Sequence, residues 1–100
     1  MKMTTLGVVY DSGTSTLLQE YILREGKGLE EKTIGFARLY RTKDDGQFWL
    51  HERFYLNAGG NQDNALPLTE TEARDWLRDR FGWWKRFNRL SERVFGDPPV

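Results

Sequence analysis

With 100 residues, the sequence has a typical size for one domain and is too short for two, so we expect a single domain over residues 1–100. Hydrophobic residues make up 38% and charged residues 30%, which is too apolar for a disordered chain, and the lack of cysteine excludes disulfides and thiolate metal sites. Fifteen basic and fifteen acidic residues leave a formal net charge of zero, so we expect no whole-protein field that attracts nucleic acid.

The first expected element is a strand over residues 5–10, which are rich in β-branched and aromatic side chains and end at a turn cluster, Asp11-Ser12-Gly13. This apolar run is short, and no small-residue cleavage site follows it. It is therefore expected to be neither a signal peptide nor a membrane span. A cytoplasmic protein without membrane contact is the resulting expectation.

Residues 17–24 fit two interpretations. Ser15 would cap a helix with Leu17 and Tyr21 on one face, whereas the same apolar residues against Gln19 and Glu20 would form a loose strand. The glycine-rich turn at residues 25–28 favours the strand, because it leads the chain back into another strand.

The clearest β feature is a hairpin of residues 33–41 and 47–56. Asp45-Gly46 lies between the two runs and is a favoured hairpin turn, because both positions tolerate positive φ. Residues 57–64 contain two glycines and several amide side chains without periodicity, so we expect a mobile loop there.

A helix is expected to begin after Thr69, which forms a T-x-x-E capping box with Glu72. With a step of roughly 100° per residue, the apolar residues through Phe95 fall within an arc of about 180°. One continuous helix through Gly82 explains this pattern, although a kink or break at Gly82 stays open. The sequence thus predicts an α+β fold in which a small antiparallel meander of three to four strands packs against a long C-terminal amphipathic helix.

Candidate chemistry is sparse. His51 is the only histidine, and a general base would need an orienting acid such as Asp45 or Glu52, but Glu52 points to the opposite strand face. The acidic residues Asp44, Asp45 and Asp63, and the pair at residues 30–31, would suit a hard metal, but turn chemistry explains Asp44-Asp45-Gly46 better. We therefore predict a protein that is not an enzyme, with no catalytic residue, no cofactor and no metal site.

The helix offers two surfaces. Its apolar arc is wider than a surface helix normally buries, so part of it either caps the small core or meets a protein partner or a second copy. The expected partner-binding residues are Phe81, Trp83, Trp84, Phe87 and Leu90.

A second, basic arc lies opposite the apolar one. Residues 74–95 carry seven basic and three acidic side chains, a net charge of +4. The arc would orient the protein on an acidic partner surface or, as the alternative, contact nucleic acid. Its expected contact residues are Arg78, Lys85, Arg86, Arg89 and Arg93.

Three segments, residues 39–43, 46–50 and 67–77, carry a resemblance. The chain resembles small uncharacterised prokaryotic proteins with a "YRT-basic-x-G-x-aromatic" hairpin and a "P-L-[ST]-x-x-E-A-x-x-W-L" helix start. The resemblance implies an accessory protein of phages or mobile elements, with an anti-CRISPR-like inhibitor as its most concrete version. Small proteins of that origin often act by stoichiometric binding, so the resemblance implies this mode of action. Residues after Phe81 depart from the pattern.

Overall fold

The computed structural model describes residues 1–81 and 86–96, and only the backbone of residues 86–88. The chain divides into two compact units: a β unit, Met1–Pro67, and a helical unit, Leu68–Val100. Within the described residues, no helix is long and apolar enough to cross a membrane.

The β unit begins with a short hairpin of β1 (Lys2–Thr5) and β2 (Val8–Asp11). Leu6 and Gly7 form its two-residue turn and both have positive φ, 51° and 79°. Such a turn matches the right-handed twist of the paired strands. The predicted single strand over residues 5–10 is therefore wrong, because the chain reverses at Leu6-Gly7.

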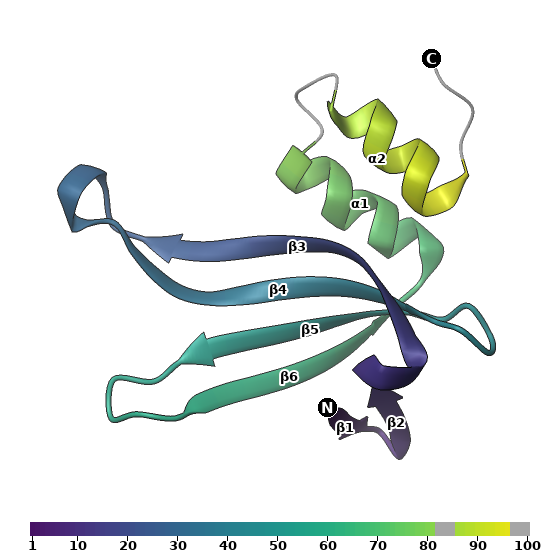
Figure 1. Ribbon diagram of the computed structural model, residues 1–100, viewed down its shortest axis with the longest axis horizontal. Helices are drawn as coiled ribbons and strands as arrows, with labels where there is room; N and C mark the ends of the chain where they lie inside the picture. The colour runs from purple at the N-terminus through teal and green to yellow at the C-terminus, as the bar shows by residue number, and fades with distance from the viewer. Residues whose placement is uncertain (82–85, 97–100) are drawn as a thin grey trace. The chain divides into compact units, whose positions relative to one another are not determined.

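The remaining strands form a separate four-stranded antiparallel sheet in the order β3-β4-β5-β6 (Figure 1). The strands are β3 (Ser15–Glu25), β4 (Lys32–Thr42), β5 (Phe48–Tyr55) and β6 (Asn61–Leu68). Short 3-10 turns lie at η1 (Ser12–Thr14) and η2 (Gly28–Glu30). The predicted central hairpin is confirmed as β4 and β5, and the ambiguous residues 17–24 belong to a strand.

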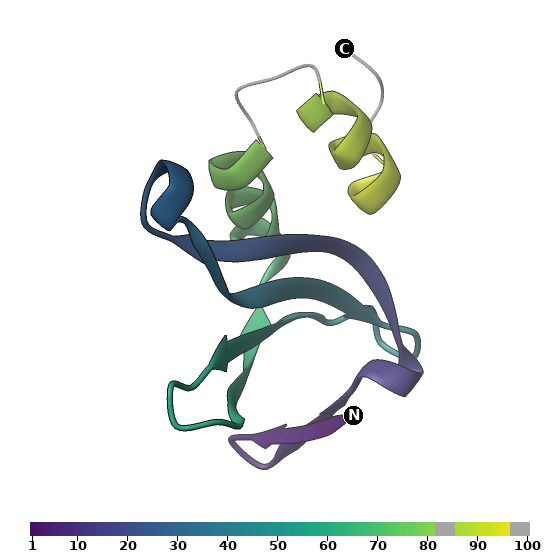
Figure 2. The same cartoon turned by 60° about the vertical axis from the view of Figure 1, so that its left-hand side comes forward.

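A buried aromatic cluster joins the hairpin to this sheet. Trp49 stacks on Tyr40 with ring centroids 4.6 Å apart and lies 5.5 Å from Tyr10 of β2. Its indole Nε1 donates to Ser15 Oγ at 3.0 Å, so the polar atom of this buried side chain is satisfied. Ala65 completes the cluster. The hairpin consequently lies along the open side of the curved sheet (Figure 2).

The helical unit contains α1 (Glu70–Phe81) and α2 (Arg86–Phe95). The predicted capping box at the start of α1 is confirmed: Glu72 N donates to Thr69 Oγ1 at 3.1 Å, and Thr69 N donates to Glu72 Oε1 at 3.0 Å. The two helices pack on each other, and the Arg74 guanidinium lies 4.2 Å from the centre of the Phe95 ring.

The predicted fold class is wrong in its architecture. The chain is α+β, but it has two antiparallel sheets and two short helices in place of one meander and a long C-terminal helix. α1 ends at Phe81, directly before Gly82, and glycine is a poor helix former that often follows a helix end. Because α2 packs on α1, part of the wide apolar arc is used between the two helices. The predicted kink at Gly82 lies outside the described residues.

Candidate binding site

A polar row crosses one face of the four-stranded sheet. His51 and Arg53 lie two residues apart on β5 and therefore share this face, and both contact Asp63 of β6. His51 Nε2 and Arg53 Nε each lie 2.7 Å from Asp63 Oδ1. Since an ionised carboxylate only accepts hydrogen bonds, the His51 Nε2 atom must carry the shared proton.

The row continues onto β4 and β3. Phe36 contacts the edge of the His51 ring at 5.1 Å between centroids, and the Arg38 guanidinium lies 4.0 Å above the Phe36 ring. Arg38 Nε in turn donates to Glu20 Oε2 at 2.6 Å. Every strand of the sheet thus contributes to one chain of ion pairs and ring contacts.

The electrostatics of the row keep Asp63 charged. The hydrogen bond from Arg53 lowers the pKa of the Asp63 carboxyl below its ordinary value; burial opposes this effect, and the His51 contact adds to the lowering. Asp63 is therefore ionised near neutral pH. His51 is only 2% exposed, so the single histidine belongs to the interior of the β unit.

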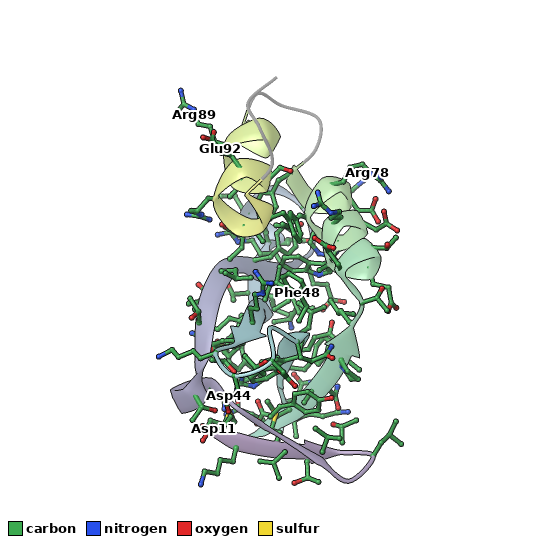
Figure 3. All side chains as sticks on the ribbon, turned by 90° about the vertical axis from the view of Figure 1, so that its right-hand side faces the viewer. Asp11, Asp44, Phe48, Arg78, Arg89 and Glu92 are labelled. Atoms are coloured by element: carbon green, nitrogen blue, oxygen red, sulfur yellow. The ribbon has the colours of Figure 1, made fainter. Side chains whose placement is uncertain are left out.

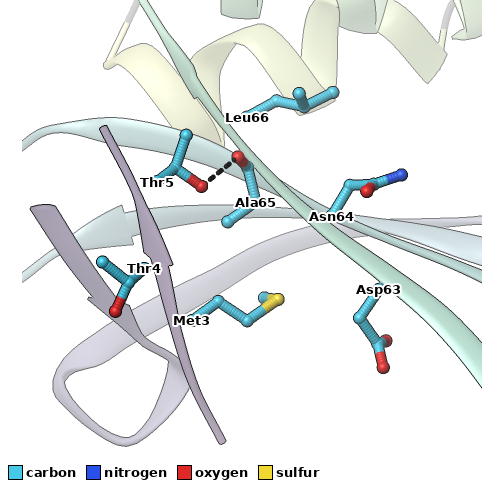
Figure 4. Close-up of a pocket in the computed structure, with 7 residues that line it drawn as sticks. All are labelled: Met3, Thr4, Thr5, Asp63, Asn64, Ala65 and Leu66. Carbon is cyan, nitrogen blue, oxygen red and sulfur yellow. Dashed lines mark hydrogen bonds between the residues drawn. The ribbon is translucent and has the colours of Figure 1, made fainter. Parts of the chain in front are cut away.

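Beside this row, a groove of about 400 Å³ runs between β1 and β6 (Figure 4). One side chain bridges the strands: Thr5 Oγ1 donates to the Ala65 carbonyl oxygen at 2.9 Å. We call this feature the β1–β6 groove. The groove is lined by Met3, Thr4, Thr5, Asp63, Asn64, Ala65 and Leu66.

The hairpin that supplies one wall of the groove ends in an exposed apolar tip, which we define as Leu6, Val8 and Val9. Leu6 is 94% exposed, and the two valines are 51% and 59% exposed. Leu6 is also the only non-glycine residue with positive φ within the described part of the chain. A leucine in this conformation is strained, because its Cβ approaches the following carbonyl oxygen.

The acidic residues considered as metal ligands are dispersed. Asp45 accepts hydrogen bonds from the Thr42 hydroxyl and from Gln47 N, which supports the predicted turn role, and these contacts lower the pKa of Asp45. Glu31 pairs with Arg24 at 3.5 Å. In residues 1–81 and 86–96, no group of three or more ligating side chains is placed to hold a metal.

The predicted partner-binding residues are only partly described. Phe81 is half-buried and contacts the edge of the Trp76 ring, and Leu90 is buried. Trp83 and Trp84 lie outside the described residues, as does the side chain of Phe87. The assignment of these residues to a partner interface therefore stays a prediction.

The predicted basic arc contains internal ion pairs. Arg78 pairs with Asp75 one turn earlier in α1, and Arg74 pairs with Glu70 at 3.1 Å. Arg89 and Glu92 project together from α2, whereas Arg78 projects from α1 on the other side of the view (Figure 3). Arg93 is exposed, whereas Lys85 and the side chain of Arg86 lie outside the description. Exposed pairs of this kind contribute little to stability, but they reduce the positive charge available to a ligand.

Sequence reasoning missed the partner of His51 and the groove. It considered Asp45 and Glu52 as orienting acids, whereas the structure places Asp63 there, because residues 61–64 belong to β6 and not to the expected loop. The sequence of β6 carries no apolar alternation that would have revealed the strand, because Asp63, Ala65 and Pro67 alternate with Gln62, Asn64 and Leu66. Comparisons of the chain with models of protein families, with curated proteins and with solved structures found no match.

Proposed function

We propose that this chain is a non-catalytic binding protein that acts by stoichiometric association with another protein, and that the hairpin tip enters an apolar pocket of that partner. The observation that carries the proposal is the conformation and exposure of Leu6. A left-handed leucine costs about 1–2 kcal/mol, and asparagine or glycine would fill the same turn position more cheaply. Strained residues cluster at functional sites, where an interaction compensates for the strain.

The surroundings of the tip support the same proposal. Thr5 pairs with Val8, so the tip follows directly on a regular ladder and is presented by a defined support. Val8 and Val9 point to opposite faces of the hairpin, which surrounds Leu6 with apolar surface. A single exposed leucine is ordinary, but exposed aliphatic side chains at the turn and on both faces of the hairpin end give it an apolar tip suited to a protein interface.

A non-catalytic role agrees with the position of His51. Its Nε2 is held by Asp63, its ring packs on Phe36, and its side chain is buried, which suits a residue that stabilises the sheet. The most concrete form of the proposal is an inhibitor that blocks its partner by occupying a pocket.

Leu6→Asn provides the test. Asparagine tolerates positive φ, so the variant is expected to be at least as stable as the parent in thermal unfolding, while removal of the apolar side chain weakens partner binding at least about tenfold. The measurement is affinity capture from the native host, followed by titration of the purified partner and light scattering, which should report one copy of each chain.

Leu29→Asn is the matched control, because Leu29 is also fully exposed at a turn but lies in η2, away from the tip. This control is expected to bind like the parent. If Leu6→Asn raises stability and still binds with the parent's affinity, the tip is not the binding element and the proposal fails.

A further inference from the structure

β6 is the outermost strand of the four-stranded sheet, and β1 is an outer strand of the hairpin. An outer strand presents backbone N–H and C=O groups that can pair with another strand. The β1–β6 groove lies where these two edges approach each other, and the bridge across it is made by the Thr5 side chain. The orientation of the backbone groups along each edge follows from the alternation of antiparallel ladders.

On β6, the ladder fixes which residues face outward. Leu56 N donates to Gly60 O just before β6 begins, so alternate residues after Gly60 direct their backbone toward β5. The backbone groups of Asp63, Ala65 and Pro67 therefore point to the free edge of β6. Two observations agree: the Ala65 carbonyl accepts the Thr5 hydroxyl, and Pro67 lacks the N–H that a paired position would need.

On β1, the tight turn fixes the alternation. Thr5 and Val8 flank a two-residue loop and form a hydrogen-bonded pair, so the next pair, Thr4 and Val9, is not hydrogen-bonded. The bond from Ser12 N to Met1 O continues the same alternation. Thr4 consequently directs its N–H and C=O to the free edge of β1, and Val9 directs its own to the opposite edge of the hairpin.

We propose that an extended segment of a protein partner adds to the edge of β6 in the β1–β6 groove, pairing with the backbone of Asp63 and Ala65 on one side and of Thr4 on the other. The inserted strand displaces the Thr5–Ala65 bridge and joins the two sheets. This inference rests on the proposed function in taking the partner to be a protein, and it places an extended chain beside the hairpin tip.

The groove also sets the side-chain pattern of the segment. Met3 packs against the Trp49 cluster, to which Ala65 belongs, so residues of the segment that point inward meet an apolar floor. Asp63 is already engaged by Arg53 and His51, which favours an uncharged residue beside it. β6 also contributes Asn64 and the partly exposed Leu66 to the lining of the groove. The pattern fits a strand with aliphatic residues at alternate positions and without proline at the pairing positions.

The test uses a short peptide of alternating valine and threonine, with a lysine at each end for solubility, and the full chain. Hydrogen exchange measured by NMR should show that the peptide protects the amides of Thr4, Asp63 and Ala65, while the Val9 amide stays unchanged. The same peptide with N-methyl groups on alternate amides cannot pair and should bind at least about tenfold more weakly. Equal binding of the two peptides, or protection elsewhere in the chain, overturns the proposal.

Two proline variants sharpen the test. Thr4→Pro removes a backbone N–H that points from β1 into the groove. Val9, the residue paired with Thr4, lies on β2, and Val9→Pro removes an N–H that points to the other edge of the hairpin, away from the groove. Thr4→Pro should weaken binding of the valine–threonine peptide about tenfold, and Val9→Pro should leave binding of that peptide unchanged. Because Val9 belongs to the tip, only the peptide, and not the native partner, is compared for this control. Equal effects of the two variants on the peptide refute the groove. The proposal is also refuted if light scattering shows a dimer of this chain in which the Asp63 and Ala65 amides are protected from exchange without peptide. If the peptide and proline experiments contradict strand addition while Leu6→Asn still weakens binding of the native partner, the strand-addition proposal fails and the proposed function stands.

Discussion

Gly35 of β4 lies opposite Phe54 of β5, at a close approach of the two strands. A Cβ built on Gly35 would lie 1.8 Å from the Arg53 carbonyl oxygen, which belongs to the backbone of the neighbouring strand and cannot rotate away. The position therefore requires glycine for space and not for a special φ. The polar row depends on this close approach, because Phe36 and Arg53 lie opposite each other directly beside it.

We predict that Gly35→Ala lowers the free energy of unfolding by about 2–3 kcal/mol, because the strands must separate to admit the methyl group. Urea unfolding followed by tryptophan fluorescence measures the change. Gly13→Ala is the control, since the three atoms nearest to a Cβ there all belong to the side chain of Asp11 and not to backbone. An unchanged midpoint for Gly35→Ala would contradict the close approach.

The charge of Asp63 leads to a second prediction about a single residue. Its folded-state pKa is lowered, first by Arg53, so the ionised carboxylate stabilises the fold above the ordinary pKa and that contribution is lost as pH falls through the lowered value. Asp63→Asn should therefore lower the free energy of unfolding by about 1–2 kcal/mol near neutral pH. The difference from the parent should shrink below the ordinary carboxyl pKa of about 4.

Unfolding curves at neutral and acidic pH, compared for both proteins, measure this effect. Asp44→Asn makes the same charge change at an exposed turn and should behave like the parent at both pH values. A deficit of Asp63→Asn that persists unchanged in acid would show that the ion pair is not its source.

At the scale of elements, the hairpin depends on the sheet. An isolated two-stranded hairpin is marginally stable in water, so β1 and β2 need the contact that Tyr10 and Met3 make with the Trp49 cluster. Tyr10 is 5% exposed and belongs to the buried cluster, whereas Met3 is only partly buried against it. The groove has β1 as one wall, and therefore exists only while the hairpin is docked.

We predict that Tyr10→Ala, which costs about 3 kcal/mol of packing, detaches the hairpin and leaves the sheet folded. Amide hydrogen exchange should accelerate in β1 and β2 and remain slow in β4 and β5. Val9 lies on the outer face of the same strand, so Val9→Ala should change the exchange rates of neither the hairpin nor the sheet. Uniform acceleration across all strands of the β unit would mean that the hairpin and the sheet unfold together.

The elements also show what sequence reasoning can reach. The β4–β5 hairpin and the α1 cap were predictable, because both depend on residues close in sequence, such as Asp45-Gly46 and the Thr69–Glu72 pair. The β1–β2 turn was missed because leucine is unfavourable where it occurs. β6 was missed because an outer strand tolerates polar residues and proline, and the Asp63 contacts depend on strand pairing across ten or more positions.

At the scale of the whole molecule, charge is balanced within each unit. The helical unit has seven basic and six acidic residues, a net charge of +1, because Glu70, Glu72 and Asp97 offset most of the +4 of residues 74–95. The β unit carries −1. The nucleic-acid alternative therefore depends on local contacts and gains little from the overall field.

We predict no retardation of a DNA or RNA duplex in a mobility-shift titration at physiological salt. Weak binding at low salt is expected to be the same for the parent and for Arg78→Glu, because Arg78 is already paired with Asp75. Binding at physiological salt that Arg78→Glu or Arg89→Glu abolishes would instead support the nucleic-acid alternative.

The stacking of Trp49 on Tyr40 has a practical consequence. Two aromatic rings fixed 4.6 Å apart in an asymmetric interior, with Tyr10 beside them, give strong near-ultraviolet circular dichroism. Since one ring of the trio belongs to the hairpin and two belong to the sheet, that optical signal reports docking of the hairpin without any label. An observer can therefore follow the opening and closing of one wall of the groove in the unmodified protein.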